Sequence, residues 1–315
     1  MYKYLAAFLY IIYMKKVLIT DTHFGIRQNS LTWLKSQEYF IYNQLIPFIK
    51  NETEPITLVH CGDVFDSRSS ISTFIASRVI NIFNALKEVC EEIIVVSGNH
   101  DFYSPNSDEI DTNILLLQQT GITILSKDIL IRDKDLYVPW YCWFEQDKLQ
   151  KIIDENNIEN VFTHADLMYN VTIKGPKIFS GHIHIPNISG RHFTLGSTYA
   201  LDFADANQDR GFYTLTEKKL KFYPNTESIK FYKFTEIPEF EVNDNDYINL
   251  YIDIENENLL NSVKDWIKNK RNCTIFPIEK THEIYEVNSE EYNIENICKN
   301  MIPDKLKDKF EMLLY

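Results

Sequence analysis

The stretch IIVVSGNHDFYS, Ile93 to Ser104, decides the fold class of this chain and raises a question about its function. Apolar residues that favour β-strands lead into a Ser-Gly pair. Three residues that can bind a metal or move a proton follow: Asn99, His100 and Asp101. A strand end gains no stability from such groups, because an unpaired buried polar group costs roughly 1 to 3 kcal/mol. The stretch therefore predicts a buried strand that ends at a functional site.

The segments on both sides alternate between strand and helix patterns. In the first half, strand patterns occupy residues 16–23, 56–63 and 92–101, and helical patterns occupy 34–51, 70–89 and 108–119. Ser70 is the expected N-cap of the second helix. Further strands are predicted at residues 121–128, 135–140, 160–166, 177–184, 191–200 and 211–224. The alternation predicts an α/β domain whose sheets are covered by helices.

Size, charge and cysteine content restrict the class of protein. A chain of 315 residues with 44% hydrophobic residues can bury one full domain and a smaller second one. The net charge of −13 argues against a protein that coats nucleic acid with its whole surface. It leaves room for a local site where metals supply positive charge. The cysteines are scattered without a CxxC pair, which is typical of a reducing compartment, so we expect a cytoplasmic protein.

The first thirteen residues are unusually apolar. Their uninterrupted apolar run, Leu5 to Tyr13, is too short to span a bilayer, and no cleavage site of a signal peptide follows it. We therefore expect no membrane association. Residues 1–13 are interpreted as an extension, with Met14 as the functional start, and a targeting segment is the alternative.

The pattern changes again toward the C-terminus, where acidic sequence containing proline separates two sets of predicted elements. We predict a main domain of residues 14–235, a small α+β domain of residues 236–287 and a helical tail of residues 288–315. The tail reads as two short amphipathic helices broken at Pro303. They either complete the small domain or dock on a partner.

Polar residues recur at the ends of the predicted strands of the main domain. They are Asp21, His23, Asp63, Asp66, Asn99, His100, His164, His182 and His184. Open sheets gather their ligand-binding residues at the carboxyl ends of the strands, so these side chains can converge. Any single histidine could be a packed core residue. Five histidines in register with aspartates and an asparagine favour a shared site.

The mixture of side chains also indicates the kind of ligand. Imidazole, carboxylate and amide oxygen without thiolate suit Mn²⁺ or Fe²⁺ and admit Zn²⁺, whereas a calcium site would contain only oxygen. The cysteine spacing excludes a structural zinc site built from cysteines. There are enough ligands for two ions that share one bridging carboxylate, an arrangement that clamps the attacking and leaving oxygens of a phosphoryl displacement.

The order of these motifs resembles that of the calcineurin-like metallophosphoesterases. The series D-x-H, GD-x-x-D, GNH-D, H and GH-x-H covers Lys15 to Pro224. Within that superfamily the chain looks most like DNA-repair exonucleases of the SbcD type, particularly the recombination nuclease subunit of large phages. The segments pointing there are DTHFGIRQNS, GDVFDSR, VPW and GSTYALDFADANQDRGFY. The resemblance implies a metallophosphoesterase β-sandwich flanked by helices, with residues 236–287 as a capping domain.

The resemblance also implies a role for each motif residue. One metal would be held by Asp21, His23, Asp63 and His184, and the other by Asp63, Asn99, His164 and His182. Asp63 would bridge the two ions, for which Mn²⁺ is the first choice and Mg²⁺, Fe²⁺ or Zn²⁺ are alternatives. His100 matches the general acid. Asp66 matches the carboxylate that orients this histidine in phosphatase relatives, a place where several nucleases of the family carry histidine.

Three classes of function follow. The first is a two-metal DNA exonuclease or endonuclease of repair or recombination, for which the resemblance implies a homodimer, an SMC-like ABC ATPase partner of the SbcC type and, if a phage encodes it, a place in the host cytoplasm. The second is a phosphatase or small-molecule phosphodiesterase of the same superfamily, which the negative net charge supports. The third, a scaffold without activity, conflicts with the intact ligand set.

Overall fold

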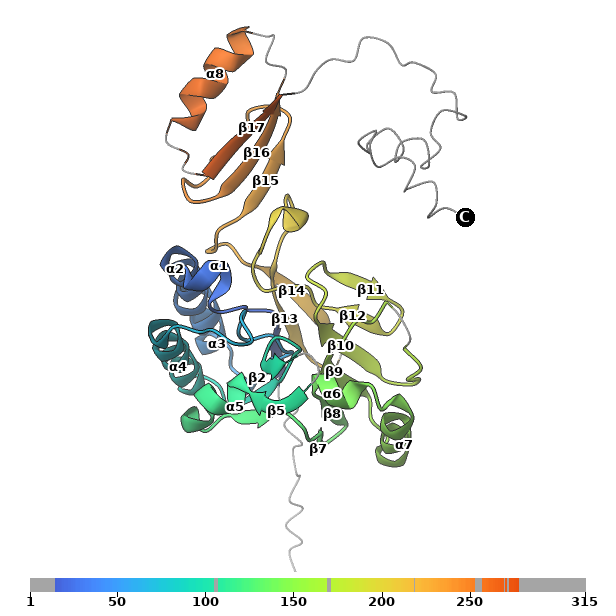
Figure 1. Cartoon of the computed structure of the whole chain (residues 1–315). Helices are drawn as coiled ribbons and strands as arrows, with labels where there is room; N and C mark the ends of the chain where they lie inside the picture. The colour runs from blue at the N-terminus through green and yellow to red at the C-terminus, as the bar shows by residue number, and fades with distance from the viewer. Residues whose placement is uncertain are drawn as a thin grey trace, which may run out of the picture.

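The computed structural model describes residues 15–104, 107–168, 171–217, 219–252, 257–268, 270 and 272–277. The predicted extension (residues 1–13) and the predicted tail (residues 288–315) lie outside these ranges, as do residues 278–287 of the predicted capping domain. Figure 1 shows two sheets packed against each other with helices on their outer faces. A smaller unit of β15, β16, β17 and α8 lies above them.

The first sheet has the order β14-β13-β1-β2-β3-β6. Its strands are β1 (Lys15–Ile19), β2 (Ile56–His60), β3 (Glu92–Val96), β6 (Thr123–Leu125), β13 (Gly211–Leu215) and β14 (Leu220–Pro224). Strands β1, β2, β3 and β6 are parallel, and β13 runs antiparallel to β1. The helical segments of this half are α1 (Ile26–Asn29), α2 (Leu31–Tyr39), the π-helical turn Phe40–Leu45, α3 (Ile46–Lys50), α4 (Thr73–Lys87), α5 (Thr112–Leu117) and a 3₁₀ turn, Gln118–Thr120.

The second sheet has the order β11-β12-β10-β9-β8-β7. Its strands are β7 (Leu130–Arg132), β8 (Asp135–Val138), β9 (Asn160–His164), β10 (Lys177–Gly181), β11 (Asn187–Ser189) and β12 (His192–Thr194). Strands β8, β9, β10 and β12 are parallel. The helical segments of this half are α6 (Trp140–Trp143), α7 (Gln146–Asn156) and the 3₁₀ turn Phe203–Asp205.

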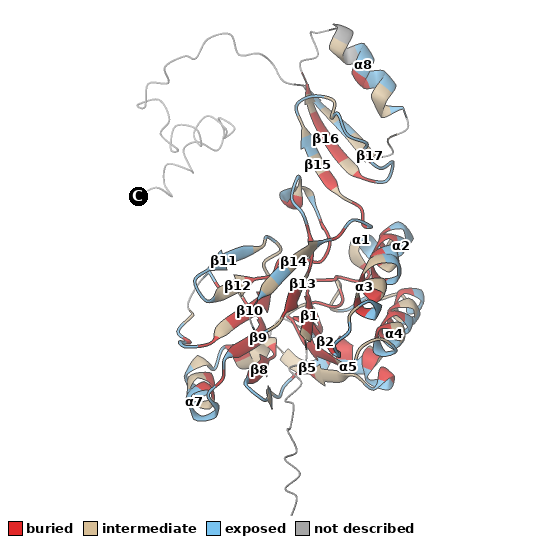
Figure 2. Cartoon of the chain, turned by 180° about the vertical axis from the view of Figure 1, so that it is seen from behind, coloured by how far each residue is buried: buried red, intermediate tan, exposed pale blue. Residues whose placement is uncertain are grey.

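Alternation along the strands explains why the two sheets pack face to face. In β3, Ile94 and Val96 point into the core between the sheets, whereas Val95 packs under the helices of the first half. Phe162 and Phe179 close the same inner core from the second sheet. Successive residues of a strand face opposite sides, so a strand that is apolar at every position must be covered on both faces. Figure 2 shows β1, β2, β9 and β10 largely in the colour of buried residues. The predicted α/β sandwich flanked by helices is confirmed.

Several predicted element boundaries were wrong. The helix predicted at 70–89 begins at Thr73, and its N-cap is Ser72 rather than Ser70, because the Ser72 hydroxyl accepts a hydrogen bond from the Ile75 amide at 3.2 Å. The helix predicted at 108–119 starts late. Residues 107–111 form β5 (Ser107–Asp111), which pairs with β4 (Phe102–Ser104), and the Asp111 carboxylate then caps α5. Local capping and hairpin pairing outweighed the helical pattern.

The small unit contains a parallel sheet, β15 (Phe231–Phe234), β16 (Tyr247–Ile252) and β17 (Asn272–Pro277), with the helix α8 (Glu257–Ile267). Ile248, Leu250 and Val263 lie in its own apolar core. Strand β15 belongs to this sheet although it precedes residue 236, where the capping domain was predicted to begin. The division into domains stays a prediction.

A cluster of aromatic side chains joins the small unit to the sandwich. The indole of Trp33, buried in α2, stacks on Phe231 at a centroid distance of 5.9 Å and lies 6.1 Å from Tyr247. The guanidinium of Arg27 lies 5.5 Å from the Trp33 ring and donates a hydrogen bond to the Leu201 carbonyl at 3.1 Å. The Arg27 guanidinium also lies 5.9 Å from the Phe231 ring and 5.6 Å from the Tyr247 ring, and because a cation over aromatic rings is stabilising, these contacts tie α1 to the small unit.

In the part of the chain that the structure describes, no helix has the length and apolar character that crossing a bilayer requires.

Candidate active site

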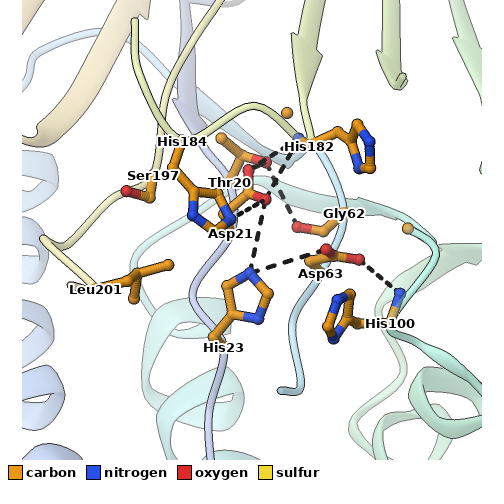
Figure 3. A network of polar contacts seen from close by, with 12 residues as sticks. Thr20, Asp21, His23, Gly62, Asp63, His100, His182, His184, Ser197 and Leu201 are labelled. Carbon is orange, nitrogen blue, oxygen red and sulfur yellow. Dashed lines mark hydrogen bonds and ion pairs between the residues drawn. The ribbon is translucent and has the colours of Figure 1, made fainter. Parts of the chain in front are cut away.

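The polar residues at the strand ends converge in the space between the carboxyl edges of the two sheets. Asp21 and His23 follow β1, Asp63 follows β2, and His182 follows β10. Figure 3 shows the carboxylates of Asp21 and Asp63 beside the imidazole rings of His23, His184 and His100. The parallel order β1-β2-β3 in one sheet and β9-β10 in the other places these strand ends together, as the sequence predicted.

Within the described residues, these side chains form three groups whose candidate ligand atoms lie within 4.8 Å of one another. The groups are Asp21, His23 and His184; Asp63, His164 and His182; and His23, Asp66 and His100. Asn99 adds an amide oxygen to the second group, because its Oδ1 lies 3.1 Å from His164 Nε2 and 2.9 Å from His182 Nδ1. Every sequence-predicted site residue therefore lies in one cluster.

The carboxylate of Asp63 lies between the first two groups. Its Oδ2 is 3.8 Å from His23 Nε2 and 3.2 Å from His164 Nε2. In the first group, Asp21 Oδ1 is 3.7 Å from His23 Nε2 and 3.6 Å from His184 Nε2. The side chains of both aspartates are almost fully buried. One buried carboxylate thus faces both groups of donors.

The backbone is strained where it presents these side chains. Asp21, His23, Asp63 and His182 have φ values of 50°, 43°, 55° and 78°. Such left-handed conformations cost about 1 to 3 kcal/mol each in residues other than glycine, and they gather at functional sites. Gly62 and Gly98, which precede Asp63 and Asn99, have to be glycine because a Cβ at either position would clash with a neighbouring side chain. A Cβ on Gly62 would lie 2.3 Å from His164 Nδ1, and one on Gly98 would lie 2.3 Å from Asp63 Oδ1.

Asp101 has a different role from its neighbours Asn99 and His100. Its carboxylate points inward and accepts hydrogen bonds from the backbone amides of Gly98 at 2.8 Å, Asp63 at 3.0 Å and Val64 at 3.0 Å. It therefore holds the loop after β2 against the loop after β3. No feature of the sequence distinguishes Asp101 from a ligand, because it directly follows His100.

His60, the last residue of β2, is a second buried support of the site. Its Nε2 lies 2.9 Å from the hydroxyl of Thr22, the residue between Asp21 and His23. Burial lowers the pKa of His60 to about 3, so the ring stays neutral. The contact orients the strained segment of Asp21 and His23 without adding charge.

The His100 side chain contacts the backbone of Asp66 and not its carboxylate. The Nδ1 of His100 lies 2.6 Å from the carbonyl oxygen of Asp66, and the His100 amide donates to Asp63 Oδ1 at 2.8 Å. The carboxylate of Asp66 lies 3.3 Å from His23 Nδ1. A neighbouring basic residue, Arg68, donates to the Asn99 carbonyl at 2.9 Å and so braces the same loop.

Comparison with protein families decides what kind of site this is. The family described as calcineurin-like phosphoesterase matches residues 14–214, about two thirds of the chain, and this span contains every residue of the cluster. The chain belongs to the calcineurin-like phosphoesterases. The family predicted from the order of the motifs is confirmed.

Two curated relatives of this phosphoesterase are named as an exonuclease subunit and as a DNA repair protein. Exonuclease subunit 1 of Enterobacteria phage T4 is 22% identical over 233 residues, which cover 67% of this chain and 68% of the relative. The DNA double-strand break repair protein Mre11 of Saccharolobus solfataricus is 32% identical over 120 residues. That match covers 38% of this chain and 31% of the relative.

Two solved structures are also similar to this phosphoesterase. A Pseudomonas putida nuclease, MPE, matches with a TM-score of 0.32 and 13% identity over 54% of this chain and 61% of that chain. The phosphopantetheinyl hydrolase of Mycobacterium tuberculosis matches with a TM-score of 0.33 and 13% identity over 60% of this chain and 90% of that chain.

The residues present fit the divalent metals that calcineurin-like phosphoesterases use. Among the described residues, both ring nitrogens of His23 are buried and make no hydrogen bond, and the carboxylate oxygens of Asp66 and Asp21 lie only at ion-pair distances of 3.3 Å and 3.7 Å from them. Such orphaned groups are costly unless something else occupies them. Imidazole, carboxylate and amide donors together suit a divalent transition metal. The identity of the metal is left open by this donor set.

Two histidines of the cluster are cationic near neutral pH when no metal is bound. Burial opposes the charge on His23, but the carboxylates of Asp21 and Asp66 outweigh it and raise its pKa to about 10. Burial also opposes the charge on His164, and Asp63 outweighs it, which raises the pKa of His164 to about 9. These same histidines hold the pKa of Asp63 well below its ordinary value although burial raises it.

Metal binding should therefore release protons. A histidine coordinates as the neutral ring, so loading the site at pH 7 should displace about two protons per chain, from His23 and His164. Because both pKa values are raised, metal affinity should fall as the pH is lowered and rise until about pH 9 to 10. Calorimetric titration with Mn²⁺ in buffers of different ionisation enthalpy measures the release. His23→Gln should reduce it by about one proton, and a wild-type value near zero would contradict the assignment.

Proposed function

We propose that this phosphoesterase is a two-metal nuclease that hydrolyses phosphodiester bonds of DNA in repair or recombination. The observation that carries the proposal is the position of the Asp63 carboxylate, which faces His23 on one side and His164 on the other. One ion would be held by Asp21, His23, Asp63 and His184. The other would be held by Asp63, Asn99, His164 and His182, with Mn²⁺ as the first choice and Mg²⁺, Fe²⁺ or Zn²⁺ as alternatives.

The bound ions would supply Lewis acidity, neutralise phosphate charge and make water acidic enough to react near neutral pH. The protein's own contribution begins with placement. The buried carboxylates of Asp21 and Asp63 keep the donors in fixed positions, and Asp101 and His60 brace the loops that carry them. Such preorganisation matters because misplacing a reacting group by about 1 Å can lower the rate a hundredfold.

We propose His100 as the general acid. Its Nδ1 faces the Asp66 carbonyl, an acceptor, so Nδ1 carries a proton in either charge state. In the protonated ring the proton on Nε2 is then available for the departing oxygen of the substrate. A general acid typically contributes about 10²- to 10⁴-fold. Asp66 would support this role through its carbonyl, and through its carboxylate beside His23.

DNA is the proposed substrate because one curated relative is named an exonuclease subunit and the other a DNA double-strand break repair protein. The negative net charge of the chain opposes binding of a polyanion, and two divalent ions at the scissile phosphate would offset that repulsion locally. The same charge is the observation that favours the alternative, a phosphatase or small-molecule phosphodiesterase.

The deciding experiment compares linear DNA with p-nitrophenyl phosphate, each with Mn²⁺ and with a chelator. We expect release of nucleotides that requires metal and that exceeds hydrolysis of the monoester. Release of nucleotides from DNA that persists in the presence of the chelator would contradict the two-metal assignment. Strong hydrolysis of the monoester with untouched DNA would replace the nuclease proposal by the phosphatase alternative.

The resemblance to the SbcD-type nucleases supports a proposal about the partners of this protein. We propose a homodimer that works with an SMC-like ABC ATPase, with residues 288–315 as the docking segment. A truncation after Asn288 should lose co-purification with an ATPase encoded nearby and should keep metal-dependent cleavage of short single strands. An insoluble or unfolded truncation would instead assign the segment to the core of the small domain.

A further inference from the structure

An aromatic pair borders the second group of metal-ligand candidates. Helix α6 begins at Trp140, directly after Pro139, and Phe144 follows at its C-terminal cap. The Trp140 ring lies 5.0 Å from the His182 ring and 6.0 Å from the His164 ring, measured between centroids. Residues four apart lie on the same side of a helix. Trp140 and Phe144 accordingly meet edge to face, with centroids 5.2 Å apart.

The helix that carries this pair is held on several sides. The Trp140 amide donates to the Ser97 carbonyl at 3.0 Å, which ties α6 to the end of β3. Tyr141 packs on Phe102 and donates its hydroxyl proton to the Ser104 carbonyl at 3.1 Å. Trp143 is buried in the core beneath the second sheet. Figure 1 shows α6 between the β4–β5 hairpin and α7.

Phe144 is nevertheless 63% exposed. A single exposed apolar side chain is common on protein surfaces, and what distinguishes Phe144 is its contact with Trp140, whose ring lies beside the metal-ligand candidates. The ring also forms one wall of a hollow of about 430 Å³, whose other lining residues are Glu145, Gln146, Asp147, Lys148 and Thr172. The hollow is shallow and open to solvent, so a flat group can reach the Phe144 ring from the surface.

The charges around the hollow indicate the kind of group it would accept. Glu145 and Asp147 contribute two negative charges, and Lys148 contributes one positive charge that already pairs with Glu145 at 2.7 Å. The net negative charge disfavours a phosphate. A neutral, flat ring is accepted, because stacking on Phe144 requires no countercharge.

We propose that Trp140 and Phe144 form a stacking platform for one nucleobase of a strand whose scissile phosphate lies at the metal cluster. This platform rests on the proposed nuclease function and adds to it a binding contact with the base next to the scissile bond. Stacking tolerates every base, so the platform would add affinity for unpaired nucleotides without sequence preference.

The test compares short single strands that differ only in their bases. Three substrates are used: an intact strand, a strand whose last two nucleotides at the 5′ end are abasic, and a strand whose last two nucleotides at the 3′ end are abasic. Cleavage of each is measured with Mn²⁺. We expect wild-type protein to show a KM that is roughly 5- to 150-fold higher for one of the abasic strands, which is the typical worth of one stacked base.

Phe144→Ala should raise KM for the intact strand and remove the difference from the abasic strand, with kcat little changed. Phe144→Trp should restore the difference. Phe74→Ala is the matched control, because Phe74 on α4 is also exposed, at 55%, and lies outside the platform. Equal metal content and equal Tm of the variants establish that folding is intact.

The outcomes separate the platform from the nuclease itself. If wild-type protein cleaves intact and abasic strands with equal KM, or if Phe144→Ala keeps the wild-type difference, the platform is wrong and the nuclease stands. If no strand is cleaved while a phosphate monoester is hydrolysed, the nuclease proposal fails and the platform fails with it.

Discussion

Asp63→Asn is expected to empty both halves of the site and to lower phosphoesterase activity at least about a thousandfold. Metal ions contribute several kcal/mol to such reactions, and each 1.36 kcal/mol corresponds to a factor of ten. The effect should be large because Asp63 Oδ2 faces His23 at 3.8 Å and His164 at 3.2 Å. Removing its charge weakens both groups of donors together. Its Oδ1 also accepts the His100 amide, so the position of His100 would loosen as well.

Metal content per chain after dialysis, measured by mass spectrometry, checks this expectation alongside activity. Asp154→Asn is a matched control, since Asp154 lies exposed on α7 and accepts a hydrogen bond only from Gln150 among the contacts described. The control should keep wild-type metal content and activity. Two retained ions in Asp63→Asn would show that this carboxylate does not bridge.

His100→Asn is expected to abolish most cleavage, by about 10²- to 10⁴-fold, while metal content and DNA affinity stay close to wild type. The reason is that the His100 side chain contacts the Asp66 carbonyl, whereas its backbone amide contacts Asp63. Asparagine keeps the amide and loses the group that can carry a proton to the leaving oxygen. Metal analysis, DNA binding and single-turnover cleavage should be measured on one preparation.

His192→Asn serves as the control for that substitution, because His192 on β12 belongs to none of the described metal-ligand groups. It should cleave DNA as wild type does. Loss of a metal ion from His100→Asn would show that His100 is a metal ligand. It would contradict the assignment of His100 as the general acid.

Much of the arrangement followed from short-range patterns in the sequence. Ile94 and Val96 alternate with Val95, so β3 had to be covered on both faces, and Asn99 and His100 had to emerge at its carboxyl end. Because parallel strands share that edge, the sequence predicted that Asp21, Asp63 and the histidines after the later strands would gather, and they do. Their individual roles as ligands and acid stay predictions.

Tertiary structure decided what local pattern could not. Asn99, His100 and Asp101 stand next to one another, yet Asp101 turns inward, where its carboxylate accepts hydrogen bonds from four buried amides of two different loops. The β4–β5 pairing replaced the first turns of the helix predicted at residues 108–119. The approach of Trp140 to His182 depends on the strand order of the second sheet, because α6 follows β8 and His182 follows β10, two strands that are far apart in the chain and separated in the sheet only by β9. Contacts of this kind depend on distances through space, and a sequence pattern encodes distances only along the chain.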